Sequence, residues 1–486
     1  DGVDVYNGEM FHNILAKMGS SLGQIDPKKK GRTMCEIFGA YGWSEGLKLM
    51  KWLTDHMLVR GINYFVPHAF TMAQFPDPDC PPHFYARGNN PQYPYFKYVM
   101  NYMNRVSHLT NGGRSVPCVA LLYSAEGEWM DYTQSQPLEK VALTLNRSQI
   151  DYEIVPEDVL CTCPAENGTF QVGQETLKAL VISGRAYVTQ RVEAWCEEAA
   201  AAGVSIFYID QQPAVVRPGA VGQAVMPEHP VGEKIELAEL TGKLKALGLH
   251  EISCDTPEPY LRYYHYRQND GDMILFFNED PHNSIDTWVQ VPLTGELSWY
   301  DAFDNVLRRA ELQDGKVHLR LTPYQGLILC QHQGEYAAEM PENPRQIAEP
   351  EEWSLTMIPA GKTEAMTEQK HFALKNLAAA DQYPDFSGTM IYETEVALAE
   401  KYPMVQIDLG RVYETVEVWV NGKSAGVRVA PPYSLNVDGD LFKQGTNHIR
   451  VLVVNTLGHQ EAQRERFSMT MPQEPVGLMG PVRILA

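Results

Sequence analysis

The sequence lacks the signals that would assign it to a membrane, nucleotide-binding or nucleic-acid-binding class. No apolar run reaches the ~18 residues that a membrane-spanning helix needs, so we expect a soluble chain with no membrane partner. No GxGxxG or GxxxxGKS/T motif follows an expected strand, so the sequence does not support nucleotide binding. The 40 Lys and Arg stand against 61 Asp and Glu, and a net charge of -21 argues against a nucleic-acid partner.

The eight cysteines in 486 residues also lack the spacing of a metal site. Cys161 and Cys163 are the only close pair, and a CxC pair without a second cluster is a poor zinc signature. We therefore expect free or buried thiols. This usage fits a reducing compartment without excluding export, so localisation stays open between cytoplasmic and exported. We also expect no serine-esterase elbow, the GxSxG turn between a strand and a helix.

The length predicts about three or four domains, and the patterning predicts a multidomain α/β plus all-β protein. Continuous apolar strands alternating with helices predict a doubly wound, flavodoxin-like domain. Alternating strands later in the chain predict β-sandwich-type domains, and Asn421-Gly422 predicts a tight hairpin turn. The expected divisions are 1–114, the C-terminal part of a (β/α)8 catalytic barrel; 115–250, flavodoxin-like; 251–335, antiparallel β; 336–352, a linker; and 353–486, a jelly-roll sandwich.

The first segment reads as strand, helix, strand, which is the βα repeat of a parallel sheet. A (β/α)8 barrel needs eight strands, and this segment supplies about three, counting a strand end at Val5. We therefore expect the C-terminal portion of a longer protein, packed against an N-terminal barrel portion that lies outside this sequence. The expected elements are a helix at 10–22, a buried strand at 32–39, a helix at 45–60, a strand at 62–68 and a helix at 94–109.

Glu36 and His68 end the two expected strands, at the barrel edge that carries the chemistry. A carboxylate at a buried strand end costs free energy unless it is paired or protonated, which is a setting that suits a glycosidase. Tyr41 and Trp43 follow Glu36 and could stack on sugar rings. The alternatives remain open: Glu36 bonded to a neighbouring amide, His68 a core residue, and the aromatic residues part of the core.

Three further features are weaker candidates. Asp4 closes the first expected strand and could be a second acid. Trp129 follows a strand of the doubly wound domain, at the edge where such domains bind ligands, although a purely structural role is favoured. The loop Asp77–Cys80 has acids at calcium-like spacing but lacks the Gly and the downstream Glu of an EF-hand, so we assign no metal ligands.

The segments Cys35–Trp43 and Val59–Phe70 resemble the end of the catalytic barrel in glycoside hydrolase family 106, whose founding activity is α-L-rhamnosidase. Pro81–Tyr85, Val119–Tyr123 and the hairpin Arg267–Asn278 also look familial. The last domain is similar to the galactose-binding-like sandwich of family 2 enzymes. The matching motifs there are Val418–Lys423, Pro431–Tyr433 and Gly445–Ile449.

The resemblance implies a glycosidase that removes a terminal sugar such as α-L-rhamnose by an inverting mechanism with two glutamates. Glu36 matches the position of one glutamate, and the other belongs to an earlier barrel strand with no counterpart here. The two carboxyls must lie ~6.5–9.5 Å apart, so we expect residues 1–486 alone to be inactive. No cofactor is expected. Family members often hold calcium, but its ligands cannot be placed in this sequence.

Two alternatives remain. The chain could be a non-catalytic carbohydrate-binding or scaffold module. It could also belong to a β-galactosidase-like retaining hydrolase, which likewise has a doubly wound domain after its barrel and holds its carboxyls ~5–5.5 Å apart.

Overall fold

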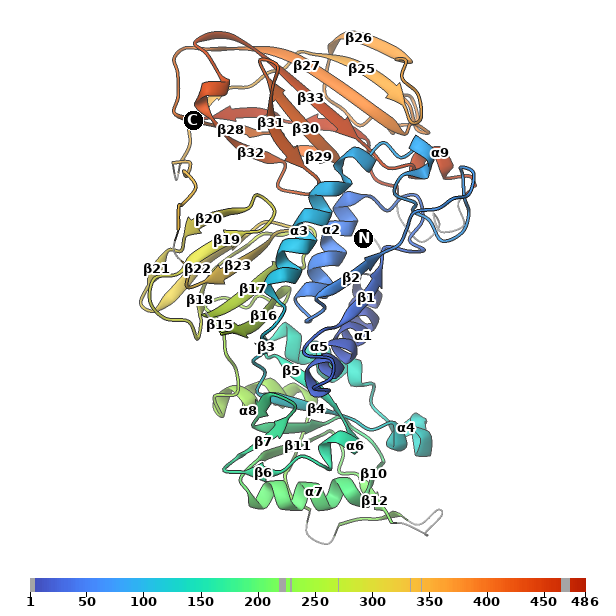
Figure 1. Cartoon of the computed structure of the whole chain (residues 1–486), viewed down its shortest axis with the longest axis vertical. Coiled ribbons are helices and arrows are strands. Elements are labelled where there is room, and N and C mark those ends of the chain that lie inside the picture. The colour runs from blue at the N-terminus through green and yellow to red at the C-terminus, as the bar shows by residue number, and fades with distance from the viewer. Residues whose placement is uncertain are drawn as a thin grey trace.

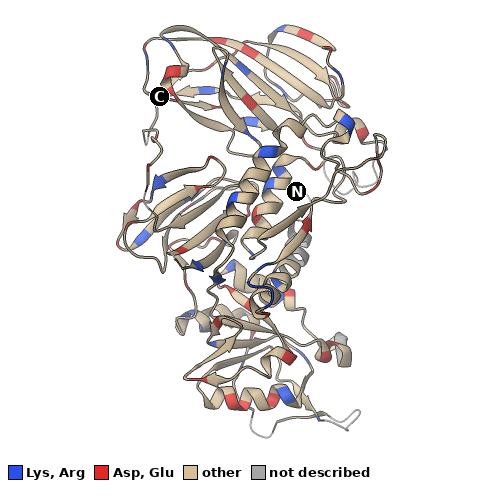
Figure 2. Ribbon diagram, in the orientation of Figure 1, with Lys and Arg blue, Asp and Glu red and all other residues tan. Residues whose placement is uncertain are grey.

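The computed structural model describes residues 5–217, 224–227, 230–269, 271–332, 334–341, 343–464 and 473–486. Three β-containing lobes surround the first segment and its two central helices, α2 (Leu47–Leu58) and α3 (Phe96–Leu109) (Figure 1). In chain order after the first segment, they are called the second, the third and the last lobe. Acidic positions are spread over all three lobes and do not gather on one of them (Figure 2). No helix among the described residues is long and apolar enough to cross a membrane.

The first segment places a short parallel strand pair against the central helices. β1 (Met34–Ile37) pairs with β2 (Tyr64–Pro67), with Glu36 opposite Val66. Ile37 packs into one apolar cluster with residues of α2 and α3, which explains why the strands lie on these helices. The remaining elements are α1 (Val5–Ile25), η1 (Ala86–Gly88) and η2 (Tyr93–Tyr95).

Two expectations for this segment are wrong. Val5 begins helix α1 and does not end a strand, because the chain there already forms the helical turns that we expected only from Met10. β1 is not buried: Met34 and Glu36 are exposed, since no described residue covers the strand face that they share. Asp4 lies outside the described residues.

The second lobe is a five-stranded parallel sheet in the order β14-β11-β9-β4-β5. Numbered along the chain this is 2-1-3-4-5 read from the β5 edge, one of the common doubly wound orders. Val119 and Leu121 face one core cluster while Ala120 and Leu122 face another, so both faces of the sheet are covered, as the apolar runs predicted. The strands are β4 (Val119–Tyr123), β5 (Tyr152–Pro156), β9 (Ala179–Ile182), β11 (Ser205–Ile209) and β14 (Glu233–Ile235), with helices α4 (Ala125–Asp131), α5 (Leu138–Arg147), α6 (Glu157–Leu160), α7 (Gln190–Ala201) and α8 (Leu240–Ala246).

Smaller pieces border this sheet. They are η3 (Tyr132–Gln134), η4 (Leu237–Glu239), β6 (Ala165–Glu166), β7 (Thr169–Val172), β8 (Glu175–Leu177), β10 (Tyr187–Thr189), β12 (Ala214–Val216) and β13 (Ala224–Val225).

The third lobe consists of two antiparallel sheets around one apolar core. The expected hairpin is confirmed, with β16 (Leu261–Gln268) paired along β17 (Gly271–Asn278); Asp270, at its turn, lies outside the described residues. The six-stranded sheet has the order β20-β19-β23-β17-β16-β3 and the four-stranded sheet β15-β18-β22-β21. The other strands are β3 (Arg114–Ser115), β15 (Ser253–Cys254), β18 (Ile285–Gln290), β19 (Ser298–Asp301), β20 (Val306–Arg309), β21 (Leu312–Gln313), β22 (Lys316–Leu321) and β23 (Gly326–Cys330).

The last lobe is a sandwich of a six-stranded sheet, β26-β25-β27-β33-β30-β31, and a four-stranded sheet, β24-β35-β28-β32. Part of the expected linker belongs to it, because β24 (Gln346–Ala348) pairs with β35 (Arg483–Leu485). Asn421 and Gly422 have φ of 50° and 78°, as their hairpin requires. The other elements are β25 (Trp353–Pro359), β26 (Thr367–Phe372), β27 (Gly388–Leu398), β28 (Met404–Asp408), β29 (Arg411–Tyr413), β30 (Thr415–Val420), β31 (Lys423–Arg428), β32 (Ser434–Asp438), η5 (Gly439–Leu441), β33 (Gly445–Val454), α9 (Gly458–Glu461) and β34 (Gly477–Gly480).

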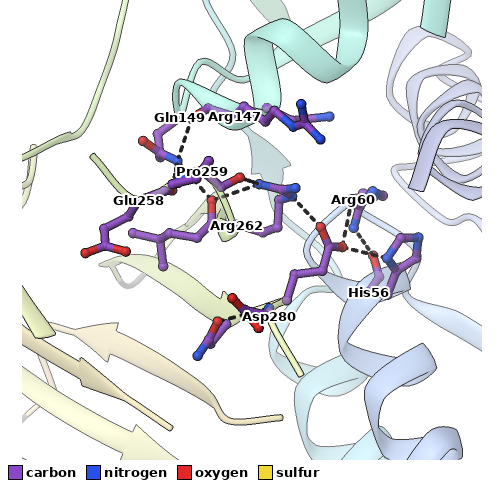
Figure 3. Close-up of polar contacts among 12 residues, drawn as sticks. His56, Arg60, Arg147, Gln149, Glu258, Pro259, Arg262 and Asp280 are labelled. Atoms are coloured by element: carbon purple, nitrogen blue, oxygen red, sulfur yellow. Dashed lines mark hydrogen bonds and ion pairs between the residues drawn. The ribbon is translucent and has the colours of Figure 1, made fainter. Parts of the chain in front are cut away.

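A buried ion cluster joins the central helix α2 to the third lobe. Figure 3 shows His56, Arg60 and Arg262 directed at one carboxylate, which belongs to Glu279. The distances to its oxygens are 2.6 Å from His56 Nδ1, 2.9 Å from Arg60 Nη2 and 2.6 Å from Arg262 Nε. Burial alone would raise the pKa of Glu279, but Arg262, Arg60 and His56 hold it well below its usual range. The cluster therefore fixes the central helix relative to the third lobe.

Candidate functional site

Glu36 and His68 lie at the carboxyl ends of neighbouring parallel strands, as the sequence predicted. The backbone amide of His68 donates to the carbonyl of Ile37 at 2.8 Å, which extends the β1–β2 pairing by one step. Glu36 is opposite Val66, and His68 follows Val66 by two residues, or ~6.6 Å of strand. Because side chains two residues apart share a face, both residues belong to the same open side of the strand pair.

That open side combines one acid with apolar side chains. Met34, Tyr64 and Val66 are 58%, 60% and 42% exposed on it, and Glu36 is exposed beside them. Within the described ranges, no basic residue forms an ion pair with Glu36. Its carboxylate is therefore available to a group from elsewhere.

The turn after β1 has an unusual backbone and packs closely on His68. Phe38 and Ala40 have φ of 81° and 68°, a region that non-glycine residues seldom occupy and that is enriched at functional sites. A Cβ added to Gly39 would lie 2.9 Å from Cγ of His68. Only a glycine therefore lets the turn come this close to the imidazole.

His83 is a neighbour of His68 that the sequence reasoning did not single out as a site residue. It is only 3% exposed, and its ring centroid lies 6.3 Å from that of His68 and 5.6 Å from that of Trp43. Its Nε2 lies 3.6 Å from a carboxylate oxygen of Asp77. Burial lowers the pKa of His83, although the charge of Asp77 opposes this, so the imidazole is neutral at neutral pH. The motif Pro81–Tyr85 was the available sequence signal for this residue.

The two aromatic candidates near Glu36 differ in their surroundings. Trp43 is 4% exposed and packs with Phe75, Ala86 and Leu457 of the last lobe, so its ring belongs to a core. Tyr41 is half-buried, and burial, followed by the nearby Glu45, raises the pKa of its hydroxyl to about 12. Tyr41 therefore remains a neutral hydrogen-bonding group near the strand ends.

Exposed aromatic rings follow β2 and were not predicted. Phe70, Tyr85 and Tyr93 are 61%, 48% and 38% exposed. The ring of Tyr93 lies 6.1 Å from that of Phe70 and 5.1 Å from that of Tyr85, in edge-to-face geometry. These three residues, all from the chain between β2 and α3, are called the aromatic shelf.

The other candidates do not join this group. Trp129 is 81% exposed on α4, which lies apart from β1 and β2 in Figure 1. The segment Gly19–Gly23 does match the GxSxG spacing, contrary to the expectation of no such motif. It lies inside helix α1, and Ser21 is buried with its hydroxyl accepting from Ile154 at 2.9 Å, so it cannot form a nucleophile elbow.

Glu45 is a buried acid close to the same loop. It is 3% exposed, and neither carboxylate oxygen has a hydrogen-bond partner among the described residues. Burial, followed by the charge of Glu414 in the last lobe, raises its pKa well above the usual value. Glu414 itself accepts from Gln92 Nε2 at 2.5 Å, and burial raises its pKa to about 7. These two acids favour the neutral form at the contact between the first segment and the last lobe.

The residues described do not assemble a calcium site. Both carboxylate oxygens of Asp77 are engaged within its loop, by the Thr71 hydroxyl at 2.5 Å and the Asp79 amide at 3.1 Å. No group of three or more His, Cys, Asp or Glu side chains in the described ranges is placed to hold a metal. All eight cysteines are free thiols, as expected.

No protein-family model matches the chain. No curated protein matches it either. Among solved structures, the chain is similar to a rhamnosidase from Novosphingobium sp. PP1Y, with a TM-score of 0.69 and 17% identity, over 97% of this chain and 49% of that chain. A beta-galactosidase from Bacillus circulans sp. alkalophilus aligns with a TM-score of 0.44 and 11% identity, over 67% of this chain and 58% of that chain. The chain therefore has the multidomain fold of a rhamnosidase over about half of that protein's length.

Proposed function

We propose that the chain is the C-terminal part of a glycoside hydrolase whose catalytic centre includes Glu36. The observation that carries the proposal is the exposed Glu36 carboxylate at the end of β1, beside His68 at the end of β2. The likeness to a rhamnosidase over 97% of the chain supports it.

In this proposal β1 and β2 are neighbouring strands of a (β/α)8 barrel, and α2 and α3 are two of its outer helices. Met34, Tyr64 and Val66 would then face the barrel interior, which accounts for an apolar strand face that no described residue covers. The other strands and the second carboxylate would lie in a part of the protein outside residues 1–486. This chain alone is then inactive.

The proposal extends to the accompanying domains. The strand order of the parallel sheet supports a flavodoxin-like domain, and the two-sheet sandwich at the end supports a galactose-binding-like jelly roll. Neither domain is proposed to carry the reaction.

The proposed reaction is hydrolysis of a terminal α-L-rhamnoside with inversion of configuration. Glu36 would act as one of two carboxyl groups, the general acid or the general base, about 6.5–9.5 Å from its partner. His68 would hydrogen-bond a substrate hydroxyl or orient the carboxylate. The aromatic shelf supports a sugar as ligand, because its exposed ring faces can stack on the apolar face of a pyranose.

The test uses the longest natural protein that contains this sequence. It is assayed for hydrolysis of 4-nitrophenyl α-L-rhamnopyranoside and 4-nitrophenyl β-D-galactopyranoside, and proton NMR identifies the anomer released first. We expect release of β-L-rhamnose, and loss of turnover in Glu36→Gln but not in Glu395→Gln, which changes an exposed glutamate on β27.

Three outcomes would contradict the proposal in different ways. Release of the α-anomer would indicate a retaining mechanism. Activity on the galactoside alone would move the assignment to a β-galactosidase-like enzyme. Sugar binding without hydrolysis of either substrate, unchanged by Glu36→Gln, would favour a non-catalytic carbohydrate-binding module.

A further inference from the structure

A furrow of two adjacent cavities lies along the side of α3 that faces the third lobe. The cavities, of about 950 and 750 Å³, share Arg105, Val306, Ala337 and Ala338 in their walls, so they lie next to each other. The first is bounded by α3 and the six-stranded sheet, and the second extends to β31 and β32 of the last lobe. Each cavity has the volume of a small-molecule site.

The furrow is separate from the Glu36 site. In Figure 1 the central helices stand between the third lobe and the strand pair β1–β2. A ligand in the furrow would therefore not contact Glu36, and the proposed hydrolase reaction gives the furrow no role.

The acids that line the furrow are mostly paired within the protein. Asp301 pairs with Arg308 at 3.1 Å, and Asp304 with Arg428 at 3.0 Å. Asp272 pairs with Arg267 at 2.7 Å. Glu335, exposed on the rim of the first cavity, is the exception among the described lining residues.

Arg105 also lines the furrow and takes no part in these ion pairs. Its Nη1 donates to the backbone carbonyls of Ala302 and Phe303 at 3.0 and 3.4 Å, which fixes the plane of the guanidinium. None of the described carboxylates pairs with it. His108 lies one turn further along α3 and also lines the first cavity. A positioned guanidinium without a carboxylate partner is suited to bind an anionic group through two parallel hydrogen bonds.

Two tyrosine rings border the first cavity in fixed positions. The Tyr300 hydroxyl donates to Asn305 at 2.7 Å, and the Tyr336 hydroxyl is 3.0 Å from the Ser298 hydroxyl. Arg309 lies over the Tyr336 ring at 4.5 Å. Held in this way, the rings add flat apolar surface to the wall, except on the side of Tyr336 that Arg309 covers. Gln268 and Gln331 add amide carbonyl groups, because their Nε2 atoms already donate to the carbonyls of Leu109 and Thr294.

We propose that this furrow binds a saccharide that carries a carboxylate, with Arg105 on the carboxylate and Tyr300 and Tyr336 beside the sugar rings. Flat aromatic faces together with amide and imidazole groups match a hydroxyl-rich ring. A purely apolar ligand would leave the guanidinium of Arg105 without a counter-charge in its site. The proposal concerns binding only and does not depend on the hydrolase assignment.

The test compares two probes that differ only at C6, methyl β-D-glucuronide and methyl β-D-glucoside, by NMR titration of the protein. We expect the glucuronide to bind at least about tenfold more tightly, since a charge-assisted hydrogen bond contributes more than a neutral one. Arg105→Gln should make the two affinities equal, and Arg105→Lys should restore part of the preference. Tyr300→Ala should weaken binding of both probes.

The control is Arg320→Gln, which removes an exposed arginine of β22, paired with Asp286 and outside the furrow. It should leave both affinities unchanged, and thermal unfolding should show that each variant is folded. Equal affinities in the original protein, no binding of either probe, or an equal loss in Arg105→Gln and Arg320→Gln would each overturn the proposal. None of these readouts involves hydrolysis, so this proposal and the hydrolase assignment can fail separately.

Discussion

Glu36 and Glu279 are the same residue type used in opposite ways. Glu279 is 2% exposed and forms ion pairs with Arg60, Arg262 and His56. Its carboxylate is therefore engaged in joining α2 to the third lobe. Glu36 is exposed at a strand end, with no ion-pair partner in the described part of the chain. A carboxylate committed to the fold cannot also serve a substrate, whereas an uncommitted one at a strand end can. The comparison therefore separates a structural acid from a candidate catalytic acid.

The largest expected effect is on turnover when Glu36 is changed. In the longer natural protein, Glu36→Gln should lower kcat by about 10²–10⁴-fold, because an amide cannot transfer a proton in the transition state. The free energy of unfolding should change by no more than about 0.5 kcal/mol, as for other exposed positions. Steady-state kinetics and urea unfolding measure the two quantities. An unchanged kcat in Glu36→Gln would show that Glu36 is not catalytic. A loss of both activity and stability would show that Glu36, like Glu279, supports the fold.

Glu279→Gln should show the reverse pattern. An amide leaves two arginines and a histidine buried without their counter-charge, and breaking such a cluster costs about 3–5 kcal/mol. Urea unfolding at neutral pH measures this loss, and the Glu395→Gln variant is the control. Because the folded pKa of Glu279 is depressed, its contribution is present above the unfolded pKa and is lost as the pH falls through the folded value. A loss below about 1 kcal/mol would show that the cluster does not hold the lobes.

Glu414 is buried like Glu279, but its pKa is raised whereas the pKa of Glu279 is lowered. Burial raises its pKa from 4.5 to about 7, so its contribution to stability is full below about pH 4.5 and is lost as the pH rises to about 7. Glu414→Gln should abolish this loss, which amounts to at most about 3 kcal/mol. The measurement is the difference in unfolding free energy between the protein and the variant from pH 4 to pH 8. A difference that stays constant over this range would contradict the assignment.

The sequence predicted buried parallel strands well, because both faces of such strands are apolar. The apolar composition of Val119–Tyr123 was enough to predict a strand that is buried on both faces. The pair Asn421-Gly422 was enough to predict a tight hairpin turn. The run Met34–Ile37 was also expected to be buried, yet the face that carries Met34 and Glu36 is open. The burial of each strand face depends on neighbouring strands, and the residues of the run carry no information about those strands.

The site was predicted in part for the same reason. Glu36 and His68 could be chosen because strand ends are visible in the pattern. The burial of Trp43 depends on Leu457, more than 400 residues later in the chain, and no local pattern reports that contact. His83 was missed because a loop has no periodicity that marks one side chain as inward-facing. Arg105 was missed because its lack of a counter-charge is a property of the assembled lobes.

The smallest expected effect tests whether the turn after β1 positions His68. Gly39→Ala places a Cβ 2.9 Å from Cγ of His68, so the imidazole must shift while the backbone, which has no positive φ at Gly39, is not strained. We expect kcat in the longer natural protein to fall about tenfold, since small misplacements of working groups reduce rates. The cost in stability should stay near 1 kcal/mol.

The control for this change is Gly242→Ala in α8, where an added Cβ meets nothing within 4 Å. It should leave kcat unchanged and slightly increase stability, since alanine favours a helix. The double variant Gly39→Ala with His68→Ala should be no slower than His68→Ala alone, because the turn can act on the reaction only through the imidazole that has been removed. Additive losses would instead mean that the turn supports the site by a route that does not pass through His68. An unchanged kcat in His68→Ala itself would show that His68 is a core residue and that Glu36 works without it.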